Sequence, residues 1–252
     1  MEVIAIVQAR MGSTRLPGKV LVDVCGQPLL KRLIDRVRAT PGIDEVVVAT
    51  TTDQSDDCLS IWCAEHSLPV YRGCVDDVLD RFWQCLQKYK AKIIVRVTAD
   101  DPLKDPTIIQ NALELCKFSP KVDYVSNTLE PSYPEGLDIE VFRYHALERA
   151  ANEATLPSER EHVTPYIWKH PDRFVLCGFG MQPNLSHWRW TVDKPADLEL
   201  IRRIFTQFPD QPLVDYETVI AWLNNHPELL LMSSGTMRNE GYYKSINQEQ
   251  NQ

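Results

Sequence analysis

The residues best suited to chemistry in this chain form a basic loop directly after its first apolar segment. Residues 4–7 run into a stretch that holds two glycines, a proline and three cations. That stretch reads Gln8-Ala9-Arg10-Met11-Gly12-Ser13-Thr14-Arg15-Leu16-Pro17-Gly18-Lys19. Such a loop offers fixed positive charge and backbone N–H groups, which are the groups that bind a polyphosphate. We therefore predict that a nucleoside triphosphate binds here.

The side chains of this loop suggest how the phosphates would be held. Arg10, Arg15 and Lys19 would make charge-assisted contacts to phosphate oxygens, and Gly12 and Ser13 would allow close approach of the backbone. The loop is not a Walker A motif, because its glycines have the wrong spacing and valine follows its lysine. A surface loop with solvated cations is the alternative. A strand-to-loop junction, however, is where α/β sheets bind ligands.

Carboxylates follow two other apolar segments, far apart in the sequence. Asp100 and Asp101 come directly after one segment, and Asp193 follows Trp190-Thr191-Val192. Carboxylates at a strand end can hold Mg²⁺, which usually bridges to substrate phosphates. The alternatives are an ordinary capped helix start near Pro106 and a helix N-cap at Asp193. A basic loop combined with two distant acidic strand ends is typical of phosphoryl or nucleotidyl transfer.

Three further segments gather ionisable residues. Residues 73–82 form either a helix cap with solvated charges or a nucleotide contact through Asp77 and Arg81. Residues 133–142 and 158–166 are weak indications of a sugar pocket. The candidate sugar-binding residues in them are Asp138, Glu140, Arg160 and His162.

The order of elements in the first half predicts a parallel sheet that would position these groups. β-branched runs at 3–7, 45–50 and 92–97 are apolar with little alternation, as in strands covered on both faces. Amphipathic stretches at 29–37, 59–64, 78–86 and 108–116 have helical spacing, and Asp76 or Asp77 is the candidate N-cap of the third. Strand alternating with helix indicates right-handed βαβ units.

The pattern changes after residue 124. Two prolines and a glycine lead into an alternating run at 137–142, which predicts an antiparallel strand or hairpin added to the sheet, and a further strand is expected at 173–177. Helices are expected at 144–154, 158–169, 196–208 and 216–224. We predict an α/β fold with one domain over residues 1–235. Residues 236–252 would form a polar C-terminal tail that is disordered at its tip.

Composition excludes several classes of protein. The 252 residues carry a net charge of −8, which argues against general binding to nucleic acid. The seven scattered cysteines have neither metal-site nor disulfide-framework spacing, and we expect them to be reduced thiols in the cytoplasm. No segment has the roughly 18 apolar residues of a membrane span. The expected partner is a small anionic ligand, with no nucleic acid or membrane.

The loop and the two acidic motifs together resemble the sugar cytidylyltransferases, which make CMP-activated acidic sugars. The branch that contains spore-coat polysaccharide biosynthesis protein F is the most similar. The segments that carry this narrower resemblance are Asp77-Val78-Leu79-Asp80-Arg81, Pro134-Glu135-Gly136-Leu137-Asp138-Ile139-Glu140-Val141-Phe142, Arg160-Glu161-His162-Val163-Thr164-Pro165-Tyr166 and Asn239-Glu240-Gly241-Tyr242. They occur in the right order over nearly the whole chain.

This resemblance implies a Rossmann-like, mostly parallel sheet flanked by helices, with a β-hairpin extension that often makes a homodimer. It implies that Arg10 and Lys19 act on the CTP phosphates, with the rest of the nucleotide site close by, and that Asp100 and Asp193 coordinate Mg²⁺. The other implied nucleotide contacts are Gln8, Ala9, Gly12, Ser13, Arg15, Asp77 and Arg81. The expected reaction couples CTP to an acidic sugar and releases pyrophosphate, for surface polysaccharide assembly.

Two other functions fit the same residues. A glycosyltransferase would use Asp100 and Asp101 to hold the diphosphate of a nucleotide sugar through a metal, although three clustered cations suit a triphosphate better. A nucleotide-binding partner without catalytic activity would bind nucleotide and show no turnover.

Overall fold

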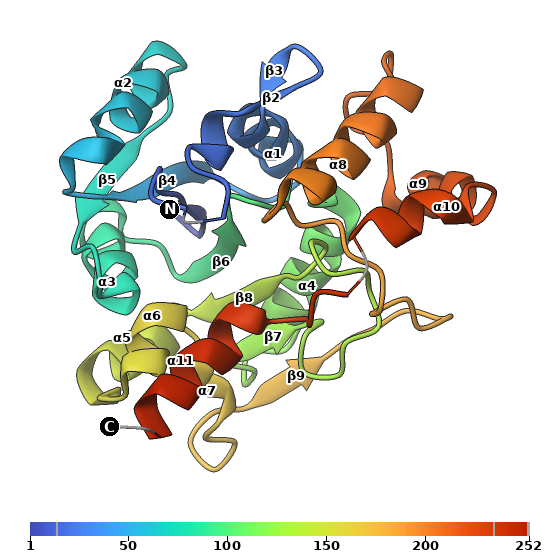
Figure 1. The fold of residues 1–252 in the computed structure, drawn as a ribbon. Coiled ribbons are helices and arrows are strands. Elements are labelled where there is room, and N and C mark those ends of the chain that lie inside the picture. The colour runs from blue at the N-terminus through green and yellow to red at the C-terminus, as the bar shows by residue number, and fades with distance from the viewer. Residues whose placement is uncertain (14, 234, 251–252) are drawn as a thin grey trace.

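A seven-stranded sheet forms the centre of the molecule, with strand order β5-β4-β1-β6-β8-β7-β9 (Figure 1). The computed structural model describes residues 1–13, 15–233 and 235–250. Within them β8 alone runs opposite to its sheet neighbours, β6 and β7, so the sheet is mostly parallel as predicted. The strands of the sheet are β1 (Val3–Gln8), β4 (Glu45–Thr51), β5 (Val70–Gly73), β6 (Ile93–Thr98), β7 (Tyr124–Ser126), β8 (Glu140–Arg143) and β9 (Leu176–Gly178).

Helices cover both faces of the sheet, and the alternation of side chains in β1 shows how. Val3, Ala5 and Val7 pack in the core formed with α1 (Leu29–Arg38), α4 (Pro106–Phe118), α8 (Pro195–Gln207) and α9 (Tyr216–Asn224). Ile4 and Ile6 point to the opposite core, formed with α3 (Val78–Tyr89), α5 (Tyr144–Glu153) and α7 (Pro165–Trp168). A strand buried on both faces has no polar face, which is why β1 reads as a continuous apolar run.

The parallel strands β1, β4, β5 and β6 end at one edge of the sheet. β1 and β6 pair from Val3↔Ile93 to Gln8↔Thr98, so the basic loop after Gln8 and the aspartates after Thr98 leave the sheet side by side. Ligands bind at this carboxyl edge in open α/β sheets. The short strands β2 (Asp23–Val24) and β3 (Gln27–Pro28) lie between β1 and α1 in the sequence, and α2 (Asp57–Glu65) lies between β4 and β5.

The region from 124 to 168 differs from its prediction in two respects. The antiparallel strand is an internal member of the sheet, and it begins at Glu140, so Asp138 lies in the loop before it. The helix expected over 158–169 is two helices, α6 (Pro157–His162) and α7, because Val163 has a φ of 72° between them. A β-branched residue in this left-handed region ends a helix.

The polar C-terminal segment contains a helix, α11 (Glu240–Gln250), preceded by the short helix α10 (Pro227–Leu230). α11 lies beside α6 in Figure 1, and Ser158 Oγ donates to Glu249 Oε2 over 3.0 Å. Residues 251–252, the expected disordered tip, lie outside the described residues. Among the described helices there is none of the length and apolar character that a membrane span requires.

Candidate active site

A cavity of about 560 Å³ opens at the carboxyl edge of the sheet, against the basic loop. We call it the loop cavity. Most of the side chains predicted to bind nucleotide line it. The residues that the sequence predicted for the site and that line this cavity are Gln8, Ala9, Arg10, Gly12, Ser13, Arg15, Lys19, Arg81, Asp100, Arg160, His162 and Asp193.

The basic loop is held in place by its own backbone and by a buried carboxylate. Gly18 N donates to Met11 O over 3.1 Å, and the φ of 70° at Gly18 suits glycine. Met11 N donates to Asp56 Oδ1 over 2.6 Å. The 3-10 turn Lys19–Leu21 then begins with Lys19, so the loop directs this lysine toward Asp100, just after β6, and Asp193. Asp193 does not follow a strand as expected: within the described residues it lies in the loop between β9 and α8.

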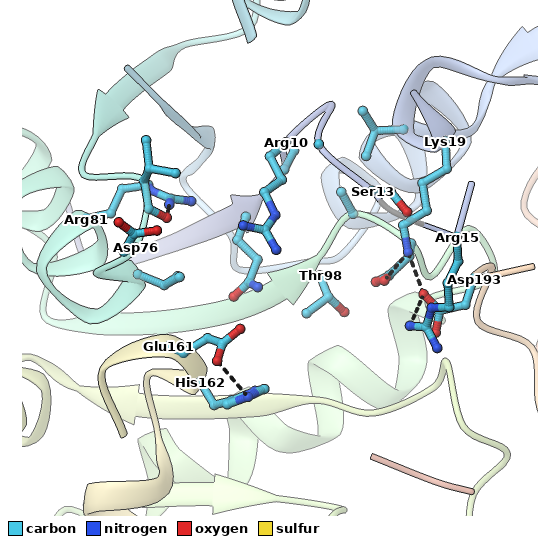
Figure 2. Close-up of a pocket in the computed structure, with 18 of the residues that line it drawn as sticks. Arg10, Ser13, Arg15, Lys19, Asp76, Arg81, Thr98, Glu161, His162 and Asp193 are labelled. Atoms are coloured by element: carbon cyan, nitrogen blue, oxygen red, sulfur yellow. Dashed lines mark hydrogen bonds and ion pairs between the residues drawn. The ribbon is translucent and has the colours of Figure 1, made fainter. Parts of the chain in front are cut away.

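Lys19 joins the two acidic motifs that lie far apart in the sequence. Its Nζ lies 2.8 Å from Asp100 Oδ2 and 2.7 Å from Asp193 Oδ1. Figure 2 marks the contact with Asp193 by a dashed line. Burial by itself lowers the pKa of Lys19, but the two carboxylates outweigh burial and raise that pKa above its ordinary value. The Asp100 pKa is lowered in turn, because Lys19 outweighs the desolvation that raises it. Three groups from three parts of the chain thus meet at one point.

The two neighbouring aspartates have different tasks. Asp101 accepts from Thr98 Oγ1 over 2.6 Å and pairs with buried Lys104 over 2.8 Å, so it stabilises the turn after β6. Asp100 faces Lys19 instead. Asp193 is not the N-cap of α8, because the N-cap is Lys194. The side chain of Asp197 accepts hydrogen bonds from the backbone N–H groups of Asp193 and Lys194.

Two cations of the loop cavity form no ion pair with a carboxylate of the described residues. Arg10 forms no ion pair with any residue in the described ranges, and its side chain extends into the cavity in Figure 2. Arg81 donates to the carbonyl oxygens of Cys74 and Val75. Burial lowers the pKa of Arg81, and the nearby Arg10 lowers it further. Two guanidinium groups that repel each other across a cavity create a field that favours an anion.

Asp77 does not line the loop cavity. Its Oδ1 caps α3 by accepting from Asp80 N over 2.8 Å, which identifies the N-cap that the sequence left open. Its Oδ2 accepts from Arg160 Nη2 over 2.6 Å. Arg160 lines the loop cavity, whereas the sequence placed it with the sugar pocket.

A second cavity of about 600 Å³ adjoins the first. We call it the C-terminal cavity, because residues 238–243 form one of its walls. Asp138, Glu140 and His162, which the sequence predicted as sugar-binding, all line it. The side chains that line both cavities are Gln8, Arg15, Thr98, Asp100, His162 and Asp193.

His162 lies at this junction and is oriented by α11. Ser245 Oγ donates to Glu161 Oε2 over 2.7 Å, so it accepts from His162 Nε2, 3.0 Å away. A hydroxyl has one proton, and Glu161 can only accept, which fixes the hydrogen on Nε2 of His162. Burial lowers the pKa of His162 to about 4, so the ring is neutral near pH 7.

Comparison with known proteins decides the family. The cytidylyltransferase family model matches residues 4–225, which is most of the chain. The chain belongs to the cytidylyltransferase family. It is therefore a nucleotidyltransferase.

Individual relatives agree with this family. The chain is 33% identical over 234 residues to spore coat polysaccharide biosynthesis protein SpsF of Bacillus subtilis, covering 90% of this chain and 96% of SpsF. It is 29% identical over 245 residues to 3-deoxy-manno-octulosonate cytidylyltransferase of Rhizobium etli, covering 81% and 96%. A solved cytidylyltransferase structure from Leptospira borgpetersenii superposes with a TM-score of 0.88 at 28% identity, covering 94% of this chain and 99% of that one.

The site of this cytidylyltransferase contains arginines that the sequence analysis missed. Arg96 lies in β6, pairs with Glu140 and donates to Gln8 Oε1 over 3.1 Å. The sequence did carry a signal for Arg96, because a charged residue within the apolar run Val95-Arg96-Val97 indicates a functional side chain. Arg189 pairs with Glu135, and Arg238 with Asp138. Glu135 and Asp138 lie 54 and 100 residues away from them in sequence, so no local pattern indicated these two pairs, although Arg189 also pairs with Asp193 four residues on.

The carboxylates of this cytidylyltransferase suit a hard divalent cation. Asp100 and Asp193 already converge on one cationic atom, Lys19 Nζ, and both offer the oxygen ligands that Mg²⁺ prefers. In the described residues there is no group of three or more His, Cys, Asp or Glu side chains placed to enclose a metal. Two carboxylates, completed by water and substrate phosphate, are the usual protein share of a Mg²⁺ site.

Proposed function

We propose that this cytidylyltransferase couples CTP to a sugar hydroxyl and releases pyrophosphate, giving a CMP-sugar. The observation that carries the proposal is the junction of the two cavities at Asp100 and Asp193. A nucleotide in the loop cavity and a sugar in the C-terminal cavity would meet there. Unpaired Arg10 supports the loop cavity as the place for the triphosphate.

The side chains of the chain would act mainly by positioning and by neutralising charge. Arg10 and Lys19 bind the phosphate oxygens, and Arg15 contacts them from the same loop. The sugar hydroxyl oxygen attacks the α-phosphorus in line. The bond from that phosphorus to the oxygen that bridges to the β-phosphate breaks as the new P–O bond forms. Pyrophosphate leaves with that oxygen, and the hydroxyl proton passes to solvent. Charge growing on the phosphates is stabilised by cations fixed in advance.

Asp100 and Asp193 would hold Mg²⁺. When bound, the ion supplies charge neutralisation to the phosphates and lowers the pKa of an oxygen that it contacts. Lys19 then exchanges its two carboxylate partners for phosphate oxygens, which keeps its charge compensated throughout.

The wider setting is part of the same proposal. A role in surface polysaccharide assembly is supported by the similarity to SpsF, which is described as a spore coat polysaccharide biosynthesis protein. We propose a homodimer, as the family resemblance implies, and a location in the cytoplasm, as the scattered cysteines suggest.

Nucleotide preference and pyrophosphate release test the proposal directly. With Mg²⁺ present, CTP should raise the melting temperature more than ATP, GTP or UTP, because a ligand that binds only the native state stabilises it. Asp193→Asn should reduce Mg²⁺-dependent pyrophosphate release by about 10²-fold or more. The matched control is Asp172→Asn, which removes an exposed carboxylate 3.6 Å from Arg173. A larger shift with a UDP- or GDP-sugar than with CTP would favour a glycosyltransferase instead.

A further inference from the structure

His162 lies where the two cavities meet, and a strained turn places it there. It lines both cavities, as Asp100 and Asp193 do. It is the last residue of α6, and Val163 after it has a φ of 72° and a ψ of −55°, while Thr164 N donates to His162 O over 2.9 Å. These values and this hydrogen bond define a γ-turn with positive φ, which is rare and strained. Strain of this kind clusters at functional sites, so the position of the ring is a feature to explain.

The surroundings of the ring fix which of its nitrogens carries the hydrogen. Nε2 of His162 lies 3.0 Å from Ser245 Oγ. Ser245 Oγ also lies 2.7 Å from Glu161 Oε2 and 3.1 Å from Gly241 O, and both of these oxygens can only accept. Ser245 therefore accepts from Nε2–H, which leaves Nδ1 without hydrogen. Within the described ranges Nδ1 has no hydrogen-bond partner and is not one of the buried unsatisfied atoms, so it is accessible to a ligand.

The charges around the ring suit a group that is neutral before the reaction and protonated during it. Glu161 Oε2 lies 3.7 Å from His162 Nε2. The other charged groups that act on the ring are Arg96 of β6, Glu140 of β8 and Glu249 of α11. Burial has the largest effect and lowers the pKa of His162, whereas Glu161 raises it. A triphosphate held by the basic loop, across the cavity from His162 in Figure 2, would raise that pKa back toward its ordinary value, because negative charge favours the protonated ring.

We propose that Nδ1 of His162 accepts the proton of the sugar hydroxyl that attacks the α-phosphorus, and that Ser245 and Glu161 hold the ring in the tautomer this requires. This inference rests on the proposed cytidylyl transfer. The O–H bond of the sugar breaks as its oxygen bonds to the α-phosphorus, and the P–O bond to the leaving pyrophosphate breaks. The proton on Nδ1 then passes to solvent. His162 is the catalytic base, and Ser245, which lies beyond residues 4–225 of the family match, is a positioning residue with Glu161.

The pH dependence of pyrophosphate release tests His162 as the base. The assay contains CTP, Mg²⁺ and 3-deoxy-manno-octulosonate as the acceptor probe. An amide does not take up a proton at neutral pH, so His162→Gln should lower kcat by about 10²-fold at pH 7. The loss should shrink as pH rises to 9, because hydroxide replaces the missing base. The Kd of a non-hydrolysable CTP analogue should change by less than about twofold. His66→Gln, which replaces an exposed histidine after α2, is the matched control.

The possible outcomes separate this role from others. A kcat of His162→Gln within about threefold of wild type overturns the proposal, and so does a loss that is equal at pH 7 and pH 9. A selective loss of preference for CTP over UTP would place Nδ1 against the cytosine base and also overturns it. A lack of CTP-dependent pyrophosphate release by wild type contradicts the proposed transfer to this sugar instead.

An isosteric substitution tests the tautomer. The amide of Glu161→Gln can donate to Ser245 Oγ, which allows the serine hydroxyl to donate to Nε2 and the ring hydrogen to move to Nδ1. A ring with its hydrogen on Nδ1 cannot accept the sugar proton there, so kcat should fall by about tenfold or more. Glu199→Gln on α8 removes an exposed carboxylate and is the control. Melting temperatures establish that the variants fold.

The ring hydrogen can be located without any turnover. ¹H–¹⁵N correlation spectra of protein with ¹⁵N-labelled histidine distinguish the two tautomers, and the signals of His162 are those that disappear in His162→Gln. We expect hydrogen on Nε2 in wild type and in Glu199→Gln, and hydrogen on Nδ1 in part of the Glu161→Gln molecules. Hydrogen on Nδ1 in wild type overturns the proposal, as does an unchanged kcat in Glu161→Gln.

Discussion

The loop cavity and the C-terminal cavity share six side chains but differ in whether their arginines pair with carboxylates. In the loop cavity, Arg10 has no ion-pair partner among the described residues, and Arg81 contacts backbone carbonyl oxygens. In the C-terminal cavity, each lining arginine pairs with a carboxylate. A cavity with unpaired cations gains free energy when an anion enters, whereas a neutralised cavity loses a pair. Arg10, without an ion-pair partner, therefore supports the proposal that the loop cavity holds the triphosphate.

The largest expected effect follows from removing the cation at the junction. Lys19→Ala takes away a phosphate ligand and leaves Asp100 and Asp193 facing each other without their shared partner. We expect kcat/KM for CTP-dependent pyrophosphate release to fall by about 10³-fold or more. Lys31→Ala is the control, because Lys31 pairs with Asp35 on the surface of α1 and should be nearly neutral. Activity of Lys19→Ala within tenfold of wild type would show that Lys19 does not act in the transfer step.

The loop cavity could be predicted from sequence because short stretches encode it. The basic loop is continuous, and parallel strands bring their carboxyl ends to one edge, so Asp100 had to lie near it. Alternation of strands and helices similarly predicted the sheet. The helix over 216–224 matches the structure at both ends.

The C-terminal cavity could not be predicted in the same way. Pairs such as Arg238 with Asp138 join residues that only tertiary packing brings together. Gly136 has a φ of 106°, and a side chain there would meet the backbone of Thr191 at 2.9 Å, so close packing of two distant loops shapes the wall. The C-terminal segment is polar overall, and its helix is stabilised by specific contacts such as that of Ser245 with Glu161. Hydrophobic periodicity does not report such contacts.

Two ionisable groups should give opposite pH dependence of stability, one from the junction and one from the C-terminal cavity. The pKa of His162 is lowered to about 4, so the folded state loses stability as pH falls below 6.5. As the pH is lowered from 7.5 to 5, the free energy of unfolding of His162→Gln should therefore rise by about 2 kcal/mol relative to that of wild type. The pKa of Asp138 is raised to about 7, so protonation of Asp138 stabilises the wild-type fold as the pH falls. Asp138→Asn lacks this contribution, and its free energy of unfolding should fall by about 2 kcal/mol relative to that of wild type over the same pH range.

Urea denaturation of wild type and both variants at the two pH values measures these differences. Comparison with wild type cancels the titration of all other groups. A difference that stays constant with pH, in either variant, would show that the side chain concerned has an ordinary pKa.

A pair of arginine substitutions separates the two cavities kinetically. Arg10→Ala should raise KM for CTP by about tenfold and leave KM for the sugar unchanged, because Arg10 lines only the loop cavity. Arg238→Ala should do the reverse, since it leaves Asp138 unpaired in the wall of the C-terminal cavity. Initial rates with each substrate varied in turn measure both constants, with Arg203→Ala on the surface of α8 as the control. Equal effects of one variant on both constants would mean that the cavities do not hold separate ligands.

The smallest effect is expected where the C-terminal segment reaches the basic loop. Glu240 pairs with Arg15 over 2.6 Å, and both side chains are about one-third exposed, so solvent screens the pair and it contributes little to stability. Glu240→Gln should lower the Kd for CTP by about twofold to threefold, because Arg15 no longer divides its charge between phosphate and Glu240. Titration calorimetry at low and high salt measures the change, which should shrink as salt screens the charges. Glu199→Gln removes an exposed partner of Arg203 and is the matched control. Weaker binding of CTP by Glu240→Gln would mean that Glu240 positions Arg15 for the phosphates and does not compete with them.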